Sequence, residues 1–252
     1  MTFEQFSQGT SLLHRADPRG KLVGTGVLSL IIALCQNIRT ALAGLLTALV
    51  LVLAARLPWK RVLHRLLVVN SFNILLWFVL PLTYGGTQLI EIAKISLSEP
   101  GLSLALLITV KANAIILIFI SLLATSTAAQ LGHGMQQLWI SPKLCLLLLF
   151  SYRYIELIYQ ELQRLRRAAK LRCFQPGTNL HTYKTYSYML GMLLVRSWNR
   201  AARVQQAMLL RGFSGNFHSL HTVKMQSGDL LLSAILLLVG LGLLLFEQLL
   251  SV

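Results

Sequence analysis

Two arginines stand in short stretches that repeat the same pattern. Arg172 lies in KLRCF, residues 170–174, and Arg211 lies in MLLRGF, residues 208–213. Each arginine follows a leucine and precedes a small residue and a phenylalanine. A guanidinium makes forked hydrogen bonds to carboxylates and carbonyls, whereas lysine offers only a point charge. The same arginines would also suit ordinary helix ends, where they offset the helix dipole or contact anionic lipid.

Other side chains with reactive or metal-binding chemistry are scattered. His218 and His221 are three residues apart, but no third ligand lies nearby in the sequence. Cys35, Cys145 and Cys173 form no CxxC pair, so the cysteines indicate neither a zinc site nor a disulfide framework. The sequence also lacks the motifs GxxxxGK[ST], GxSxG and HExxH. We therefore expect no metal site, no cofactor and no catalysis by this chain itself.

The composition is that of an integral membrane protein. Of the 252 residues, 55% are hydrophobic and only 12% are charged, and the mean hydropathy is +0.66. The formal net charge of +15 calls for anionic lipid headgroups or an acidic protein partner. A chain embedded in a membrane has little access to nucleic acid, so we expect membrane lipid and protein as its partners.

Hydrophobic runs predict an all-α, polytopic protein with about five transmembrane helices. The expected spans cover about residues 22–36, 40–57, 62–82, 102–125 and 230–250. The first span is short. The expected organisation is four spans in residues 1–125, an inserted region in residues 126–229, and a last span in residues 230–252.

Lysines and arginines predict the orientation, because positively charged loops stay in the cytoplasm. The flank of the first span, the connection between the second and third spans, and residues 126–229 carry most of these residues. The opposite side carries only Arg39 and Lys94, and Glu91 and Glu99 offset the latter. We expect a multi-pass protein of the inner (plasma) membrane with a cytoplasmic amino terminus and a carboxyl terminus outside.

Residues 126–229 are expected to form three cytoplasmic helices. A short helix begins near Ser126 and ends before Ser141-Pro142, a pair that stops one helix and starts the next. The second helix begins apolar, becomes strongly basic, and ends before Pro176. The third covers about residues 183–210 and has Gly212 in the position of a carboxyl-terminal cap. Both arginine stretches therefore mark helix ends.

Four stretches resemble the transmembrane T component of energy-coupling factor (ECF) transporters, most closely its CbiQ branch. They are YRYIELIYQELQRLRRAAKLRCF (152–174), RSWNRAARVQQAMLLRGFSGNF (196–217), DPRGKL (17–22) and LLATSTAAQLGHGMQQLWISPKL (122–144). The resemblance implies a non-catalytic subunit that joins a substrate-binding membrane protein, CbiM-like, to two ABC ATPase subunits, CbiO-like. The CbiQ-like spelling favours cobalt or nickel uptake, and a vitamin such as biotin is the alternative substrate.

The resemblance also implies a role for the two helix ends. In that family each coupling helix ends in a motif, usually Ala-Arg-Gly, that docks in a groove of one ATPase. The corresponding residues here are Leu171, Arg172, Cys173 and Phe174 in the first motif and Leu210, Arg211, Gly212 and Phe213 in the second. Leucine replaces alanine in both motifs. Because Cys173 adopts a left-handed cap less cheaply than glycine, the second motif is expected to match the family more closely.

Two other classes of protein remain open from the residues alone. A stand-alone permease would use polar residues inside its spans, and Asn70, Asn73 and Lys111 lie there. The simpler interpretation is that the asparagines form hydrogen bonds between helices and that the lysine reaches a pocket. A membrane-bound enzyme would need carboxylates or histidines clustered at one interface, but the acidic residues near the cytoplasmic edge are Glu156, Glu161 and a few isolated ones.

Overall fold

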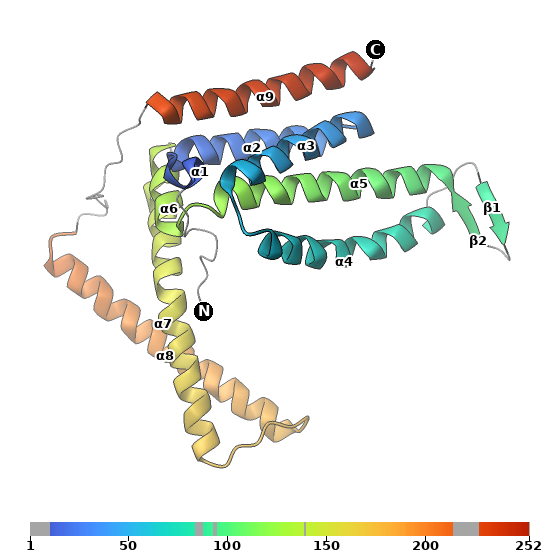
Figure 1. Ribbon diagram of the computed structural model, residues 1–252. Coiled ribbons are helices and arrows are strands. Elements are labelled where there is room, and N and C mark those ends of the chain that lie inside the picture. The colour runs from blue at the N-terminus through green and yellow to red at the C-terminus, as the bar shows by residue number, and fades with distance from the viewer. Residues whose placement is uncertain (1–10, 84–87, 93–94, 139, 214–226, 252) are drawn as a thin grey trace. The chain divides into compact units, whose positions relative to one another are not determined.

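The computed structural model describes residues 11–83, 88–92, 95–138, 140–213 and 227–251. Long helices account for most of these residues (Figure 1). The helices are α1 (Leu12–Arg15), α2 (Pro18–Leu34), α3 (Ile38–Ala55), α4 (Trp59–Thr83), α5 (Glu99–Ile118), the π-helix η1 (Phe119–Leu123), α6 (Ala128–Gln137), α7 (Pro142–Leu171), α8 (Leu180–Leu210) and α9 (Ser227–Ser251). The prediction of an all-α, polytopic chain is confirmed.

A short strand pair between α4 and α5 was not predicted. Strands β1 (Gln88–Ile92) and β2 (Ile95–Ser98) pair antiparallel, with Glu91 opposite Ser96. Apolar and polar residues alternate along β2, ISLS, which is the period of a strand, whereas β1, QLIEI, has two adjacent apolar residues. The sequence therefore held a signal for this hairpin, beside the much stronger helical signal of its neighbours.

The chain divides into two compact units. The first comprises residues Met1–Gly134 and Val223–Val252, and the second comprises residues Met135–Thr222. The first unit contains the long apolar helices, and the second contains α7 and α8. Which of these residues lie in the membrane and which in the cytoplasm remains a prediction.

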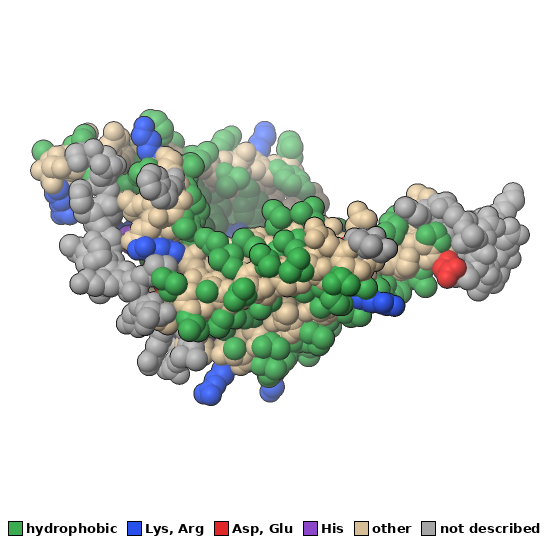
Figure 2. Space-filling view, turned by 90° about the horizontal axis from the view of Figure 1, so that it is seen from above, with side chains coloured by type: hydrophobic (Ala, Val, Ile, Leu, Met, Phe, Trp, Pro, Cys, Tyr) green, Lys and Arg blue, Asp and Glu red, His purple; other side chains and the backbone are tan. Residues whose placement is uncertain are grey.

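Four helices of the first unit are long and apolar enough to cross a membrane. They are α3, α4, α5 continued through η1, and α9, and they correspond to the last four expected spans. The first expected span corresponds to α2, whose 17 residues reach only the lower end of the usual length. Many large apolar side chains of these helices are exposed, and hydrophobic side chains are spread over the surface in the space-filling view (Figure 2). This surface suits a hydrocarbon environment.

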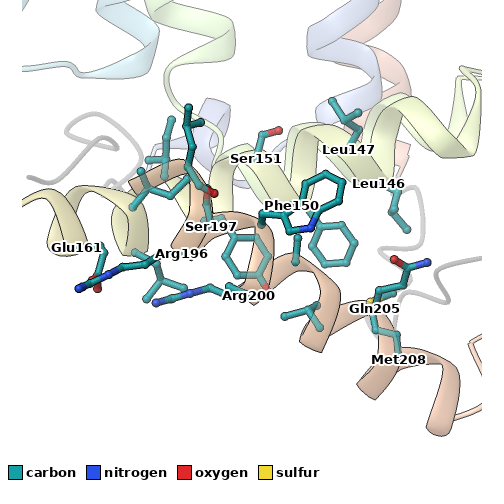
Figure 3. A pocket seen from close by; sticks show the side chains of 18 of the residues that line it. Leu146, Leu147, Phe150, Ser151, Glu161, Arg196, Ser197, Arg200, Gln205 and Met208 are labelled. Carbon is teal, nitrogen blue, oxygen red and sulfur yellow. The ribbon is translucent and has the colours of Figure 1, made fainter. Parts of the chain in front are cut away.

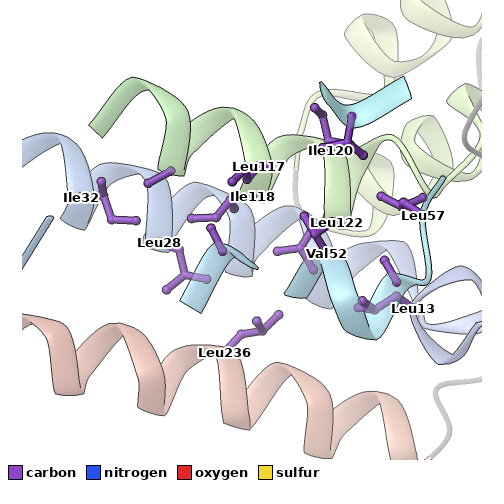
Figure 4. Close-up of a cluster of buried hydrophobic side chains, with 14 of the residues drawn as sticks. Leu13, Leu28, Ile32, Val52, Leu57, Leu117, Ile118, Ile120, Leu122 and Leu236 are labelled. Carbon is purple, nitrogen blue, oxygen red and sulfur yellow. The ribbon is translucent and has the colours of Figure 1, made fainter. Parts of the chain in front are cut away.

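The core of the first unit forms where α2, α3, α5, η1 and α9 meet. Leu28, Ile118 and Leu122 are completely buried there, and Leu236 of α9 packs against the same cluster (Figure 4). Small residues bring α2 and α9 close together. A Cβ atom added at Gly24 would lie 2.6 Å from Cδ1 of Leu236. Close approach at small residues is typical of helices packed in membranes.

Lys111 and Glu247 stabilise the turn between α2 and α3. Nζ of Lys111 donates a hydrogen bond of 3.1 Å to the carbonyl oxygen of Ala33, in the last turn of α2. Oε1 of Glu247 accepts hydrogen bonds from the backbone N–H groups of Gln36 at 2.8 Å and Asn37 at 3.3 Å. The positive charge thus meets a helix carboxyl terminus and the negative charge meets a helix amino terminus, as the helix dipole favours.

Candidate functional site

The carboxyl terminus of α7 forms a Schellman cap. Arg172 occupies the C-cap position, and Cys173 after it adopts a left-handed conformation with φ of 58°. The N–H of Phe174 donates to the carbonyl of Ala169 at 3.1 Å, and the N–H of Cys173 donates to the carbonyl of Lys170 at 3.0 Å. This pair of bonds satisfies carbonyl groups that a helix otherwise leaves without partners.

The carboxyl terminus of α8 has the same geometry. Gly212 is left-handed with φ of 76°, and Arg211 precedes it. The N–H of Phe213 donates to the carbonyl of Met208 at 3.1 Å, and the N–H of Gly212 donates to the carbonyl of Leu209 at 3.0 Å. The predicted helix end at Leu210 is confirmed. The two motifs therefore end their helices with one backbone structure.

Cys173 takes the conformation that glycine takes in the second motif. A left-handed conformation costs a residue with a side chain roughly 1–2 kcal/mol. The two hydrogen bonds of the cap offset this cost. The departure from the Ala-Arg-Gly pattern therefore changes the side chain at this position and leaves the path of the backbone as it is at Gly212.

Leucines and arginines are the exposed parts of both motifs. Leu171 and Leu210 are 87% and 89% exposed, the highest values among the large hydrophobic residues that the structure describes. Arg172 and Arg211 are exposed as well. Burial of an exposed leucine and pairing of a guanidinium would both favour contact with another protein.

The two phenylalanines pack within the second unit. The ring of Phe174 meets the ring of Tyr186 edge-on, with centroids 5.8 Å apart, and lies 6.2 Å from the ring of His181. Phe213 is half-buried and lines a groove between α7 and α8. Both rings therefore stabilise the helix ends from inside. Their contact with an ATPase remains a prediction.

The groove between α7 and α8 is open and mainly apolar. It has a volume of about 1540 Å³, and Leu146, Phe150 and Met208 are among its lining residues (Figure 3). Glu161 and Arg196 lie together at its wall (Figure 3). Such a groove suits the side chains of another helix.

One ion pair joins the two long helices at this groove. The guanidinium of Arg196 donates a hydrogen bond to Oε1 of Glu161, and Arg164 lies 3.6 Å from the other carboxylate oxygen. The hydrogen bond from Arg196 lowers the pKa of Glu161, although burial opposes this effect. This pair was missed from the sequence. The signal was weak: Glu161 is one of only two acidic residues within residues 135–222, which hold twelve lysines and arginines.

The polar residues expected inside the spans have partners in the structure. Nδ2 of Asn73 donates to Oδ1 of Asn70 at 3.3 Å along α4, and Lys111 binds the carbonyl of Ala33. The asparagines thus bond within one helix, whereas the sequence predicted bonds between helices, and Lys111 binds the end of α2. These contacts do not assemble the three residues into a polar pathway.

The described residues bring together no group of three histidine, cysteine, aspartate or glutamate side chains that could hold a metal ion. His218 and His221 lie outside the described residues. Cys35 and Cys145 are buried, while Cys173 is exposed, and none of them forms a disulfide within the described part of the chain.

Comparisons with known proteins agree with the helical architecture. Residues 9–222 match the model of the CbiQ family, described as cobalt transport protein. The chain is 30% identical to the energy-coupling factor transporter transmembrane protein EcfT of Bacillus subtilis, over 85% of each chain. It is 28% identical to the EcfT protein of Streptococcus equi, over 96% of this chain and 94% of that one. The chain therefore belongs to the CbiQ family and is the transmembrane component of an energy-coupling factor transporter.

Proposed function

We propose that this chain transmits the motion of two ABC ATPase subunits, CbiO-like, to a substrate-binding membrane subunit, CbiM-like. ATP is hydrolysed in the ATPases, and this chain carries the movement. Arg172 and Leu171 dock in one ATPase, and Arg211 and Leu210 dock in the other. The observation that carries this proposal is the pair of helix ends with the same capped backbone and the same exposed Leu-Arg sequence.

Rigid helices are well suited to this transmission. The 30 residues of α7 and the 31 residues of α8 give rods of roughly 45 Å at 1.5 Å per residue. The Glu161–Arg196 ion pair joins the two rods, so a displacement of one helix end is passed to the other. The Schellman caps hold each Leu-Arg pair at a fixed place on its helix.

The exposed apolar side of α8 supports a second contact. Leu194, Val195 and Trp198 are 69%, 56% and 78% exposed. A substrate-binding subunit that lies in the same membrane would cover them with apolar side chains of its own. Aromatic residues such as tryptophan often contribute strongly to interfaces of this kind.

The membrane is the plasma membrane, with residues 126–229 on the cytoplasmic side, where ATP is available. The excess of lysine and arginine in residues 135–222 supports this orientation through the positive-inside rule. The amino terminus is then cytoplasmic and the carboxyl terminus lies outside.

The transported substrate is cobalt or nickel. The description of the matched family as a cobalt transport protein supports this assignment. The substrate-binding subunit selects the ion, and this chain supplies none of the ligands. Uptake of labelled cobalt by cells that express the complete transporter tests the assignment, with biotin as the competing substrate. Uptake of biotin without uptake of cobalt or nickel would contradict it.

Docking is tested with the variant Arg172→Ala/Arg211→Ala in the complete transporter. Loss of an interfacial arginine commonly costs about 2 kcal/mol or more of binding free energy. We expect little ATPase to co-purify with the double variant and uptake to fall accordingly. The variant Arg166→Ala/Arg203→Ala removes two exposed arginines from the same helices away from their ends and is the matched control. Normal co-purification and uptake with the first variant would overturn the proposal.

A further inference from the structure

The first turn of α2 contains a fully buried lysine. Lys21 is 0% exposed, and its Nζ atom donates a hydrogen bond of 2.8 Å to Oγ of Ser126. The carboxylates of Asp229 and Asp17 are close enough to attract its charge. The positive-inside rule would place this residue among the exposed flanking charges of the first span. Its burial shows that the ammonium serves the interior of the first unit.

The same turn also holds the start of α9. Oδ1 of Asp229 accepts a hydrogen bond of 3.0 Å from the backbone N–H of Asp17. Oδ1 of Asp17 in turn accepts from the backbone N–H of Arg19 at 2.9 Å and caps α2. Asp17 is itself buried. We call Asp17, Lys21, Ser126 and Asp229 the α2 cluster.

Ser126 and Asp229 of the α2 cluster lie close in sequence to the two boundaries of the first unit. The chain leaves the first unit at Gly134, shortly after Ser126, and returns to it at Val223, shortly before Asp229. Gly134 also packs on α2, because a Cβ atom added to it would lie 3.2 Å from Cβ of Pro18. Any force that enters the first unit along the backbone therefore arrives at segments attached to the first turn of α2.

The π-helix η1 ends three residues before Ser126 of the α2 cluster. In η1 the N–H of Ala124 donates to the carbonyl of Phe119 at 3.1 Å, which is the wider spacing of a π-turn. Oγ1 of Thr125 then bonds the carbonyls of Ser121 and Leu122, both at 3.0 Å. Single π-turns in helices often mark functional sites. Here the π-turn is the place where the helical spacing changes next to Ser126.

Burial of the ammonium is costly, and one apolar residue in its place would avoid the cost. The hydrogen bond to Ser126 offsets part of the cost only while Ser126 stays in place. This hydrogen bond therefore holds the segment that leads to α6 in one position relative to α2. A merely apolar contact would tolerate sliding along the helix.

We propose that Lys21 is a positioning residue for energy coupling. With Asp17, it fixes the segment before α6 and the start of α9 to α2, so that movement of the coupling helices shifts α2 and α9 together. This inference rests on the proposed function. It assigns the first turn of α2 as the place where movement enters the membrane helices.

The test compares Lys21→Met with wild type in the complete transporter. Three quantities are measured: the ATPase retained on purification, the rate of ATP hydrolysis, and the uptake of cobalt per ATP hydrolysed. We expect retention and hydrolysis close to wild type, while uptake per ATP falls about tenfold, in the usual range of coupling between sites. Ser126→Ala removes the acceptor with little change of volume, and the same direction of change is expected. It keeps the test decisive if Lys21→Met fails to fold.

Lys111→Met is the matched control. Its ammonium also binds within the first unit, to the carbonyl of Ala33, but at the opposite end of α2. We expect its uptake per ATP to stay within about twofold of wild type, as for a purely structural contact. Equal losses in the two methionine variants, or loss of hydrolysis and uptake in proportion, would overturn the assignment of Lys21.

The outcome also separates this inference from the proposed function. If the wild-type chain retains no ATPase, the proposed function and this inference both fail. If Lys21→Met and Ser126→Ala retain the ATPases and keep normal uptake per ATP, this inference alone fails.

Discussion

Arg196 of α8 donates a hydrogen bond from its guanidinium to Oε1 of Glu161 on α7. The two residues are separated by 35 positions in the sequence, and each lies in the interior of a long helix. Glu161 is buried even though much of the surface of both helices is exposed. The pair therefore sets where the two helices touch.

Replacement of Glu161 by glutamine should weaken the contact between α7 and α8. The amide keeps the shape of the side chain but loses the charge that Arg196 and Arg164 share. We expect a lower Tm of the purified protein in detergent and faster amide exchange along both helices. Glu156→Gln is the control, because the carboxylate of Glu156 accepts a solvent-exposed hydrogen bond from Gln160 of the same helix. An unchanged Tm in Glu161→Gln would contradict this role.

The same pair predicts a dependence on pH. The pKa of Glu161 lies below its ordinary value of 4.5, chiefly because Arg196 donates to the carboxylate. A lowered pKa stabilises the folded state above the ordinary value, and the stabilisation is lost as the pH falls through the lowered pKa. The Tm difference between wild type and Glu161→Gln should thus be constant above about pH 5 and shrink at more acidic pH. A difference that grows on acidification would be inconsistent with this sign.

Cys173→Gly should stabilise the end of α7. The left-handed backbone is free of strain for glycine, so the free energy of unfolding should rise by about 1 kcal/mol. Thermal unfolding measures the change. Cys173→Ala removes the thiol but keeps Cβ, and we expect no comparable gain from it. Equal stability of the glycine and alanine variants would show that the left-handed position carries no strain.

Two glycines of α2 should respond oppositely to alanine. At Gly24 the added Cβ would lie 2.6 Å from Leu236, whereas at Gly26 it would meet nothing within 4 Å. Gly26→Ala should stabilise the helix by about 0.5–1 kcal/mol. Gly24→Ala should lower the Tm, because α9 must move away or Leu236 must change its rotamer. The packing of α2 on α9 would be different from that described if both variants had the same effect.

Leu210→Ala and Phe213→Ala should separate docking from folding. Leu210 is 89% exposed, so its loss should change the stability by less than about 0.5 kcal/mol and reduce the retention of ATPase. The ring of Phe213 is half-buried and lines the groove, so truncation to alanine should lower the Tm while the backbone hydrogen bond of the cap is kept. Leu171 and Phe174 offer the same comparison on α7. Full retention of ATPase by the double variant Leu171→Ala/Leu210→Ala would contradict a docking role for these leucines.

The helix boundaries could be predicted where a local residue determines them. Pro142 begins α7, and Gly212 ends α8, as the sequence predicted. The short helix was predicted to reach Ile140, whereas α6 covers Ala128–Gln137. Its start is fixed by a capping box, in which Thr127 and Gln130 exchange hydrogen bonds.

Contacts between distant residues could not be predicted in the same way. Lys21 and Ser126 are 105 positions apart, and neither residue type indicates the other. The π-turn of η1 has no composition that distinguishes it from the apolar helix before it. The two motifs have the same backbone conformation, but the sequence did not predict this because Cys173 replaces glycine in the first motif. A residue type predicts the cost of a left-handed conformation, but it does not predict whether the two hydrogen bonds of the cap offset that cost.

The exposure of Leu171 and Leu210 has a consequence for biogenesis. Burial of a leucine that is almost wholly exposed is favourable, so copies of this subunit made in excess of their partner are expected to associate more readily than assembled copies. Synthesis in step with a partner that covers these helix ends would limit such association. A copy of this subunit that finds no partner would be a substrate for the proteases that degrade unassembled membrane proteins.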